Sequence, residues 1–401
     1  MARQAAMRLL GACVLLGALA TLGPARSIDA AKVQPDGTAV TLQGKVATVG
    51  KSDFSKVLPQ FVAGVSQGAV QSNDVTEASG IAASRKNANV LWVHNDSGDS
   101  ARVFAMTTTG THLGIYNLSG MTARDCEDIA IGPGPTPGES YLYIGDIGDN
   151  NAAYSTVFVY RVAEPAVSST QQPVNVNLSG VQKFTLSYED GPRDAETLMV
   201  DPTNGDLYVL SKRVSQSKVY RVPAASLVPG TTITMHAVAQ LPWGWTTGGD
   251  ISPNGNEVII RGYGQASLWR RPPGGNLWDA FSGTEHPIAL RSEPQGEAIC
   301  FEGNGRGCFT TSEGAHQPIY YYSRVPDAAN AFLYIEEPSG AYLTLDEGSA
   351  PVRVDTSLLC LAVVAGDLIG VCGLSSLLRS GSTRLRLLIP RADADVTVIR
   401  P

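Results

Sequence analysis

An internal repeat restricts the fold of this chain more than any other feature of its sequence. Glu77 precedes Asp96 by the same interval that separates Glu127 from Asp146, and a short apolar run lies within each interval. Both units continue into a Val-Phe pair and later carry Asn-Leu-Ser-Gly, so the match extends over several features in one register. Such a repeat indicates a fold built from copies of one small unit.

The unit recurs three more times, and its length and composition indicate its architecture. The later copies start at Glu196, Asp250 and Glu297, so successive starts are separated by comparable lengths of chain. Each copy has room for four short strands joined by turns rich in Gly, Pro and Asn, and helical periodicity is almost absent. Repeated four-stranded units are typical of a β-propeller. We predict an all-β propeller with five legible blades, in which residues 28–76 complete the last blade or add a sixth.

The start of the chain predicts a targeting signal. Arg3 and Arg8, an apolar run at 9–22 and the small-x-small sequence at 25–27 have the pattern of a secretory signal peptide. We therefore expect a secreted, periplasmic or extracellular protein. The predicted divisions are a signal peptide at 1–27, an N-terminal segment at 28–76, the propeller at 77–325 and a C-terminal tail at 326–401.

The net charge narrows the classes of partner. Removing the signal peptide, with three Arg and no acid, takes the formal net charge from −7 to −10. An acidic surface repels the phosphate backbone, so we predict no nucleic-acid partner. The same surface suits metal cations.

The tail contains a stretch whose hydropathy permits two structures. Residues 358–378 are mostly apolar and precede several Arg, as in a membrane span. Asp367 would cost about 2.5–3.5 kcal/mol near the bilayer centre, which nearly offsets the gain from the Leu, Ile and Val side chains. Short runs at 342–345, 384–388 and 396–399 favour strands, so we expect a membrane contact only if 358–378 spans.

The cysteines suggest one pairing. Five remain after the signal peptide, so one is free or intermolecular if all the others form disulfides. Cys300 and Cys308 flank a predicted hairpin turn that could place them opposite each other. Cys360 with Cys372 is a weaker pairing.

Acidic residues recur at corresponding points of the repeats, where a propeller would bring them together. Blades start near the central axis, so residues entering each first strand and leaving each second strand crowd onto one face. The first set comprises Glu77, Glu127, Glu196, Asp250 and Glu297. The second set comprises Asp96 with Asp99, Asp146 with Asp149 and Asn150, Lys212, Arg261, and Glu313.

This set of side chains predicts a particular chemistry. Carboxylates without a matching set of His and Cys suit Ca²⁺, which takes six to eight oxygen ligands. Lys212 and Arg261 would bind a small anionic partner, and His94 or His316 could act as a general base. We predict that a calcium site includes Glu77, Asp96, Glu127, Asp146, Asp149, Glu196, Asp250, Glu297 and Glu313.

Each of these assignments has a structural alternative. Acids at strand starts can accept backbone N–H groups and fix the packing between blades, and Asp-x-Gly-Asp can serve only to form turns. His94 and His316 can be packing residues. Trp243 and Trp245 can pack in the core or at the rim, or form a platform for a carbohydrate or aromatic ligand.

Several stretches together resemble a family of poorly characterised secreted β-propellers. The resemblance runs from about residue 77 to 322 and includes Glu77-Ala-Ser-Gly, His94-Asn-Asp-Ser-Gly, Asp125-Cys-Glu-Asp-Ile, Gly145-Asp-Ile-Gly-Asp-Asn, Asp194-Ala-Glu and Gln295-Gly-Glu-Ala. More distantly, the chain is similar to the calcium-dependent β-propeller phytases. That resemblance implies acidic calcium sites and basic phosphate contacts on one face.

Two functions follow from these observations. The first is a metal-dependent hydrolase of a phosphoester or lactone, in which Lys212 and Arg261 stabilise developing negative charge. The second is a non-catalytic extracellular binding or scaffold propeller with structural calcium. In both, we expect the protein to be a monomer.

Overall fold

The structure is a computed structural model that describes residues 60–325 and, outside them, the backbone of nine short strands. The chain divides into two compact units. One is Phe61–Arg324, and the other combines Met1–Gln60 with Val325–Pro401.

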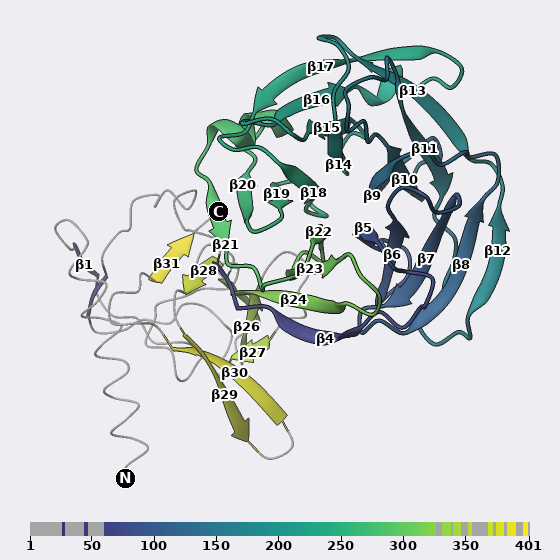
Figure 1. The fold of residues 1–401 in the computed structure, drawn as a ribbon. Coiled ribbons are helices and arrows are strands. Elements are labelled where there is room, and N and C mark those ends of the chain that lie inside the picture. Colours follow the sequence, from purple (N-terminus) through teal and green to yellow (C-terminus); the bar gives the residue numbers. More distant parts are fainter. Residues whose placement is uncertain are drawn as a thin grey trace. The chain divides into compact units, whose positions relative to one another are not determined.

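The unit Phe61–Arg324 is a five-bladed β-propeller, as the repeat predicts (Figure 1). Blade 1 comprises β5 (Ala78–Ala83), β6 (Val90–Asn95), β7 (Arg102–Thr107) and β8 (His112–Leu118). Blade 2 comprises β9 (Cys126–Pro133), β10 (Ser140–Asp146), β11 (Val157–Ala163) and β13 (Gln182–Tyr188). Blade 3 comprises β14 (Ala195–Val200), β15 (Leu207–Ser211), β16 (Lys218–Val222) and β17 (Thr232–Gln240).

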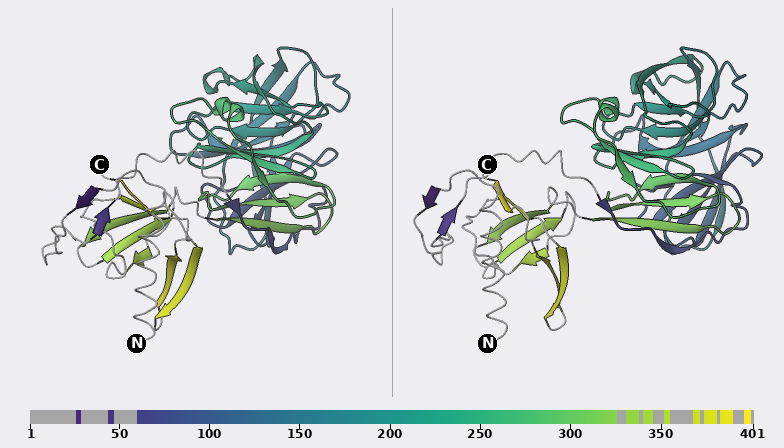
Figure 2. Two further views of the ribbon diagram at one scale, coloured as in Figure 1. Left: turned by 90° about the vertical axis from the view of Figure 1, so that its left-hand side faces the viewer. Right: turned by 60° about the vertical axis from the view of Figure 1, so that its left-hand side comes forward.

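The last two blades complete the ring. Blade 4 comprises β18 (Thr246–Ile251), β19 (Glu257–Gly262), β20 (Ala266–Arg270) and β21 (His286–Ile288). Blade 5 comprises β22 (Gly296–Phe301), β23 (Gly307–Ser312), β24 (Pro318–Val325) and β4 (Val65–Ala69). Two 3₁₀ turns, η2 (Ala224–Ser226) and η3 (Leu277–Ser282), lie in the outer connections of blades 3 and 4. Figure 2 shows the propeller unit from two further directions.

The ring is closed by a strand from the start of the propeller unit. β4 runs antiparallel to β24 (Figure 1), with Val65 opposite Tyr321 and Gly68 opposite Ile319. β3 (Gln60–Phe61) lies at the same edge. The innermost strands β5, β9, β14, β18 and β22 contact one another in turn around the axis, and β22 contacts β5. The segment before the first repeat therefore completes the fifth blade, and residues 61–324 hold no sixth.

Two parallel pairings join neighbouring blades at their outer edges. β12 (Val174–Leu178), which lies between β11 and β13 in the chain, pairs in parallel with β8 of blade 1. β13 of blade 2 pairs in parallel with β17 of blade 3. Blades 1, 2 and 3 are thus connected by backbone hydrogen bonds as well as by side-chain packing.

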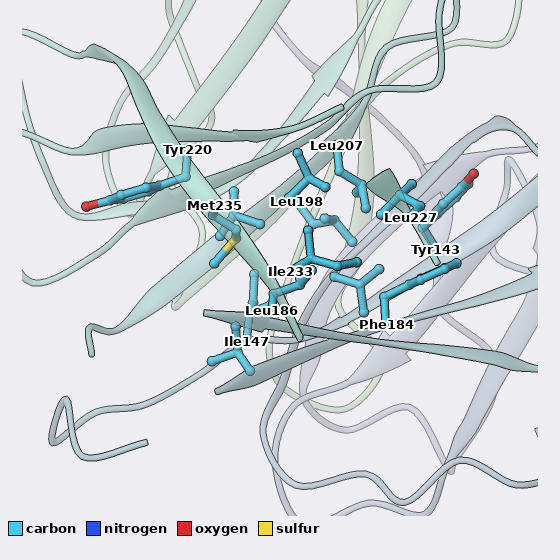
Figure 3. Packing of buried hydrophobic residues seen from close by; sticks show 14 of the residues in the cluster. Tyr143, Ile147, Phe184, Leu186, Leu198, Leu207, Tyr220, Leu227, Ile233 and Met235 are labelled. Carbon is cyan, nitrogen blue, oxygen red and sulfur yellow. The ribbon is translucent and has the colours of Figure 1, made fainter. Parts of the chain in front are cut away.

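The hydrophobic core consists of layers between the blades. In the described residues, five clusters of buried apolar side chains each join two neighbouring blades. Successive residues of one strand point into different layers, as Ile129 and Ala130 of β9 do. Because both faces of each sheet are covered, the inner strands β5, β14, β18 and β22 are buried at every position. Figure 3 shows the layer between blades 2 and 3, where Phe184, Leu186 and Leu198 are fully buried.

Removing one of these side chains should be costly. Phe184→Ala is expected to lower the free energy of unfolding by about 3–5 kcal/mol, because the adjoining blades cannot collapse into the space left behind. Val65→Ala, at an exposed position, should change it by less than about 0.5 kcal/mol. Urea unfolding followed by circular dichroism measures both. A loss below about 1 kcal/mol for Phe184→Ala would contradict the layered core.

The expected facing of Cys300 and Cys308 is wrong. The hairpin forms, but its register puts Cys300 opposite Phe309 and Cys308 opposite Phe301. The two thiols therefore lie on different faces of blade 5, Cys300 in the layer toward blade 1 and Cys308 in the layer toward blade 4. Both are buried and free, as is Cys126. Cys360 and Cys372 lie outside the described residues.

The second unit contains short strands. A five-stranded sheet is formed by β25 (Ala331–Glu337), β26 (Gly340–Leu345), β27 (Val352–Val354), β28 (Leu368–Val371) and β31 (Val396–Ile399). Two antiparallel pairs are β29 (Leu374–Ser380) with β30 (Thr383–Ile389), and β1 (Arg26–Ile28) with β2 (Gly44–Val46).

The sequence also predicts a signal peptide at the start of the chain and a possible membrane span at 358–378. Among the described residues there is no helix with the length and apolar composition that a membrane crossing requires. Most of the predicted signal peptide, and the part of 358–378 before β28, lie outside the described residues.

Candidate functional site

Every innermost strand begins with a β-bulge at the same place. In each blade, one extra residue of the first strand interrupts its pairing with the second strand. A bulge redirects the side chains around it, and such features are common beside active sites. The extra residues in blades 1 to 5 are Ser79, Glu127, Glu196, Thr247 and Glu297.

The bulges give the true alignment of the blades and define three rings of residues around the axis. The bulge ring comprises the five residues just named. The pre-strand ring lies two positions earlier and comprises Glu77, Asp125, Asp194, Trp245 and Gln295. The loop ring follows the second strands and comprises Asp96, Ile147, Lys212, Tyr263 and Glu313. We refer to this end of the propeller as the acidic face.

This register corrects the alignment expected from the sequence. Glu77 corresponds to Asp125 rather than to Glu127, and Asp250 lies three residues beyond the bulge of its blade. The equal spacing of the two acid pairs arises by coincidence, because Asp146 corresponds to Asn95 rather than to Asp96.

Three blades bring carboxylates together at the acidic face. Oxygen atoms of Asp96, Asp125 and Glu127 all lie within 4.8 Å of one another. The same holds for Glu127, Asp194 and Glu196, so Glu127 belongs to both groups. We call the first group the blade 1–2 trio and the second the blade 2–3 trio. Each has the composition of a divalent-cation site made of oxygen ligands.

Local structure places these side chains. The Asp125 N–H donates to Asp146 Oδ1 at 2.9 Å, and the Asp149 N–H donates to Asp194 Oδ1 at 2.9 Å. A Cβ atom at Gly148 would collide with both Glu127 and Asp125, so glycine is needed beside the trio. The end of β10 and the loop after it therefore position the acids through hydrogen bonds, and Asp146 and Asp149 belong to neither trio.

The carboxylates of the blade 1–2 trio lie in surroundings that disfavour their negative charge. Burial raises the pKa of Glu127 well above its ordinary value, and neighbouring Glu196 and Asp96 raise it further. Burial, followed by Asp96 and Asp194, raises the pKa of Asp125 to about 6. Among the described residues, no Lys or Arg forms an ion pair with any member of this trio. A bound cation would relieve this repulsion.

Lys212 distinguishes the blade 2–3 trio from the first. Its Nζ atom pairs with Glu196 and donates to Tyr263 Oη at 2.8 Å. Burial lowers the pKa of Lys212, but Glu196 and Tyr263 outweigh that effect, so the pKa lies above its ordinary value. Burial still raises the pKa of Glu196 to about 8 despite the lysine. This group therefore already contains its counter-charge.

Blades 5 and 1 place three further acids on the acidic face, namely Glu77, Glu297 and Glu313. The backbone of Glu77 bridges to that of Glu313 across the two blades. Burial, then the proximity of Glu297, raises the pKa of Glu313 to about 8.

The raised pKa values predict how stability depends on pH. The folded protein keeps protons on Glu196 and Glu313 up to about pH 8, whereas their ordinary pKa is 4.5. Their contribution to stability is therefore complete below pH 4.5 and is lost as the pH rises through about 8. His94, His112 and His286, whose pKa values burial lowers from 6.5, act in the opposite direction at lower pH.

The pH range above 6.5 is thus the informative one. In the presence of EDTA, urea unfolding should show stability falling from about pH 6.5 to 8. Calcium should weaken the part of this dependence that Asp125 and Glu127 contribute, because the metal would replace the protons that their raised pKa values favour. Stability that rises over this range without metal would contradict the described cluster.

Two other predicted ligands have mainly structural contacts. Asp149 accepts the N–H groups of Ala153 and Tyr154 at 2.8 and 2.7 Å, which closes a turn. Asp250 accepts the Ile251 N–H at 2.8 Å and that of Phe301 in the next blade at 2.9 Å. These positions match the structural alternative, in which acids fix turns and blade packing.

The predicted catalytic residues are not brought together. Arg261 is buried and paired with Glu293 at 2.9 Å, and its Nη1 donates to the Ala298 carbonyl at 3.0 Å. His94 is buried, its Nδ1 lies 2.8 Å from the Asn95 carbonyl, and burial lowers its pKa. Of the three, Lys212 alone has its charged atom at a ring acid within the described structure.

Of the remaining residues that the sequence singles out, three have structural contacts and one is exposed. His316 Nδ1 lies 2.9 Å from the Val70 carbonyl. Trp243 donates to Glu285 at 2.8 Å and packs on Trp269. Trp245, in contrast, is 48% exposed. Asp99 accepts from Asn95 and pairs with Arg102 at 2.9 Å.

Sequence reasoning missed Asp125, Asp194 and Tyr263. A signal for the first two was present, because Asp-x-Glu occurs at both 125–127 and 194–196. Aligning these two tripeptides would have placed both rings correctly in blades 2 and 3.

Comparisons with known proteins add little to this site. No protein-family model matches the chain, and no curated protein matches it. Among solved structures, a luciferin-regenerating enzyme is similar at 10% identity and a TM-score of 0.36, covering 66% of this chain and 95% of that chain. A TM-score this low transfers no property of that enzyme to this chain.

Proposed function

We propose that this protein is an exported, calcium-dependent hydrolase whose ion is held by Asp96, Asp125 and Glu127. The observation that carries the proposal is the convergence of these three carboxylates within 4.8 Å. They come from two blades and lack an ion pair with any described Lys or Arg. Calcium fits because the donors are all hard oxygens, and the ion would take its further ligands from carbonyl groups or water.

The blade 1–2 trio is favoured over the blade 2–3 trio because of Lys212. The ammonium group of Lys212 already lies against Glu196, so a cation at the blade 2–3 trio would meet a positive charge among its first contacts. Glu127 stands between the two groups and links them. A cation at the blade 1–2 trio would therefore lie beside a lysine–carboxyl pair.

The arrangement supplies the parts that hydrolysis needs. When bound, calcium would polarise a substrate oxygen and make a coordinated water more acidic. Glu196, with a pKa of about 8, exchanges a proton readily near neutral pH and is suited to general acid–base catalysis. Lys212, which Tyr263 holds in turn, fixes the position of its carboxyl group.

Charge selects between the two substrate classes expected from the sequence. Eight of the fifteen ring positions are Asp or Glu and one is Lys. The two predicted anion donors, Lys212 and Arg261, both pair with glutamates. A phosphoester would be repelled by these surroundings, whereas a lactone or other neutral ester would not. We therefore propose a neutral ester or lactone substrate.

A non-catalytic binding propeller remains the second candidate, and one observation favours it. The blade 1–2 trio bridges two blades, so an ion there would also clamp them together. In that case calcium would stabilise the protein without supporting turnover.

The test separates the two. Metal-free protein is titrated with calcium by calorimetry, and hydrolysis of δ-valerolactone, p-nitrophenyl acetate and p-nitrophenyl phosphate is measured with calcium and with EDTA. We expect calcium-dependent hydrolysis of the neutral esters and none of the phosphate. Asp96→Asn should abolish both binding and turnover. Binding and stabilisation without turnover would favour the binding propeller, and the absence of binding would refute both.

A further inference from the structure

Blade 4 interrupts the acidic rings. Where other blades carry acids, it contributes Trp245, Thr247 and Tyr263, so none of its three ring positions is charged. Two of these side chains are large aromatic rings open to solvent. Trp245 is 48% and Tyr263 43% exposed. The acidic face therefore has a charged part on blades 1, 2, 3 and 5 and an aromatic part on blade 4.

The backbone at Trp245 is held in an unfavourable conformation. Its φ of 63° lies in the left-handed region, which a bulky side chain rarely adopts. Burial of the ring does not compensate for this strain, since nearly half of the residue is exposed. Arg213, which also has a left-handed φ of 55°, places its guanidinium 5.7 Å from the Trp245 ring centre. Arg213 is itself anchored to Asp194 at 2.7 Å.

Tyr263 is oriented from within the acidic site. Its hydroxyl accepts from Lys212 Nζ at 2.8 Å, and that ammonium lies 4.8 Å from the centre of the ring. Lys212 in turn pairs with Glu196. Each exposed ring therefore contacts a basic residue that pairs with an acid of the blade 2–3 trio. Trp245 contacts Arg213, which pairs with Asp194, and Tyr263 contacts Lys212, which pairs with Glu196.

We propose that Trp245 and Tyr263 form the subsite for the flat apolar part of the substrate. This inference rests on the proposed function and specifies its substrate class as an aryl-bearing neutral ester or lactone. Aromatic rings recognise planar apolar groups by face or edge contact, and they gain area burial when exposed rings are covered. A strained, solvent-exposed tryptophan fixed by an anchored arginine is pre-positioned for such a contact.

Two lactones that share a ring but differ in one aryl group test the proposal. Dihydrocoumarin carries a fused benzene ring and δ-valerolactone does not. Trp245→Gly should reduce kcat/KM for dihydrocoumarin by about fivefold or more and leave δ-valerolactone nearly unchanged. Trp245→Phe should restore most of the loss. Equal effects on the two lactones would overturn the proposal.

Folding is controlled within the same set of variants. Glycine tolerates the left-handed φ, so Trp245→Gly should melt at or above the temperature of the wild type. Tyr154→Ala is a matched control, because Tyr154 is 42% exposed and stacks on Arg124 at 3.8 Å but lies on blade 2. It should affect neither lactone selectively.

A binding measurement keeps this inference distinct from the proposed function. Dihydrocoumarin binding to the wild type and to Trp245→Gly is compared by saturation-transfer NMR in calcium. If no lactone is hydrolysed but binding depends on Trp245, the subsite stands and the hydrolase proposal fails. If lactones are hydrolysed and neither binding nor selectivity depends on Trp245, the subsite is refuted and the hydrolase stands. Absence of binding in the wild type refutes the subsite.

Discussion

Replacing Glu127 by Gln is expected to abolish calcium binding and calcium-dependent hydrolysis while leaving the metal-free protein at least as stable as the wild type. Glu127 belongs to both carboxylate groups, so its loss removes a ligand that no neighbour can replace. Without metal, its charge is unfavourable because it is buried beside Glu196 and Asp96, as its raised pKa reflects. The amide removes that repulsion and keeps the shape.

Calorimetry and thermal melts measure the two halves of this prediction. Calcium at about 1,000 times its Kd should stabilise the wild type by about 4 kcal/mol and Glu127→Gln by almost nothing. Asp250→Asn provides the contrast, since Asp250 holds Phe301 of the next blade and should destabilise the protein without loss of calcium binding. If Glu127→Gln destabilised the metal-free protein and still bound calcium, Glu127 would be a structural residue.

Removing the closing strand should have the largest effect on folding. A chain of residues 71–324 is expected to lose the cooperative unfolding transition that a chain of residues 61–324 shows. Without β4, the edge of β24 loses its backbone partners. Val70, buried in the layer between blades 5 and 1, is lost with it. The closed ring then becomes an open arc with an unpaired strand edge.

Urea unfolding and amide NMR dispersion compare the two fragments. The longer one should unfold in a single sharp transition, and the shorter one should show poor dispersion or aggregate. The comparison is matched because both fragments end at residue 324 and differ only in the segment that contains β4. A sharp transition in both would show that blade 5 closes without β4.

The sequence predicted the propeller because its repeat reports hydrophobic runs and turns, which are local features. It could not predict the register of the bulges. A bulge adds one residue to one strand, and nothing in the composition of Ser79 or Thr247 marks them as equivalent to Glu127. The acids of blades 2 and 3 were therefore only partly identified, and Asp250 was placed in a ring it does not join.

The aromatic part of the site could not be predicted from the sequence for a related reason. The role of Tyr263 depends on its contact with Lys212 of the neighbouring blade, which lies far earlier in the chain. Likewise, Arg261 is a basic residue near a predicted strand end, but in the fold its guanidinium group forms an ion pair with Glu293. Partners contributed by neighbouring blades decide which charges stay available, and spacing along one repeat does not report them.

The parallel pairings at the outer edges bear on ion selectivity. β12 with β8 and β13 with β17 connect the three blades that carry both carboxylate groups. The spacing of Asp96, Asp125 and Glu127 is thus set by the sheets before an ion arrives. Mg²⁺ demands a tight octahedron at about 2.0–2.1 Å, whereas Ca²⁺ accepts longer and less regular contacts. Contracting the proposed site around the smaller ion would pull against backbone ladders at the rim of the propeller, so we expect calcium to bind more tightly than magnesium.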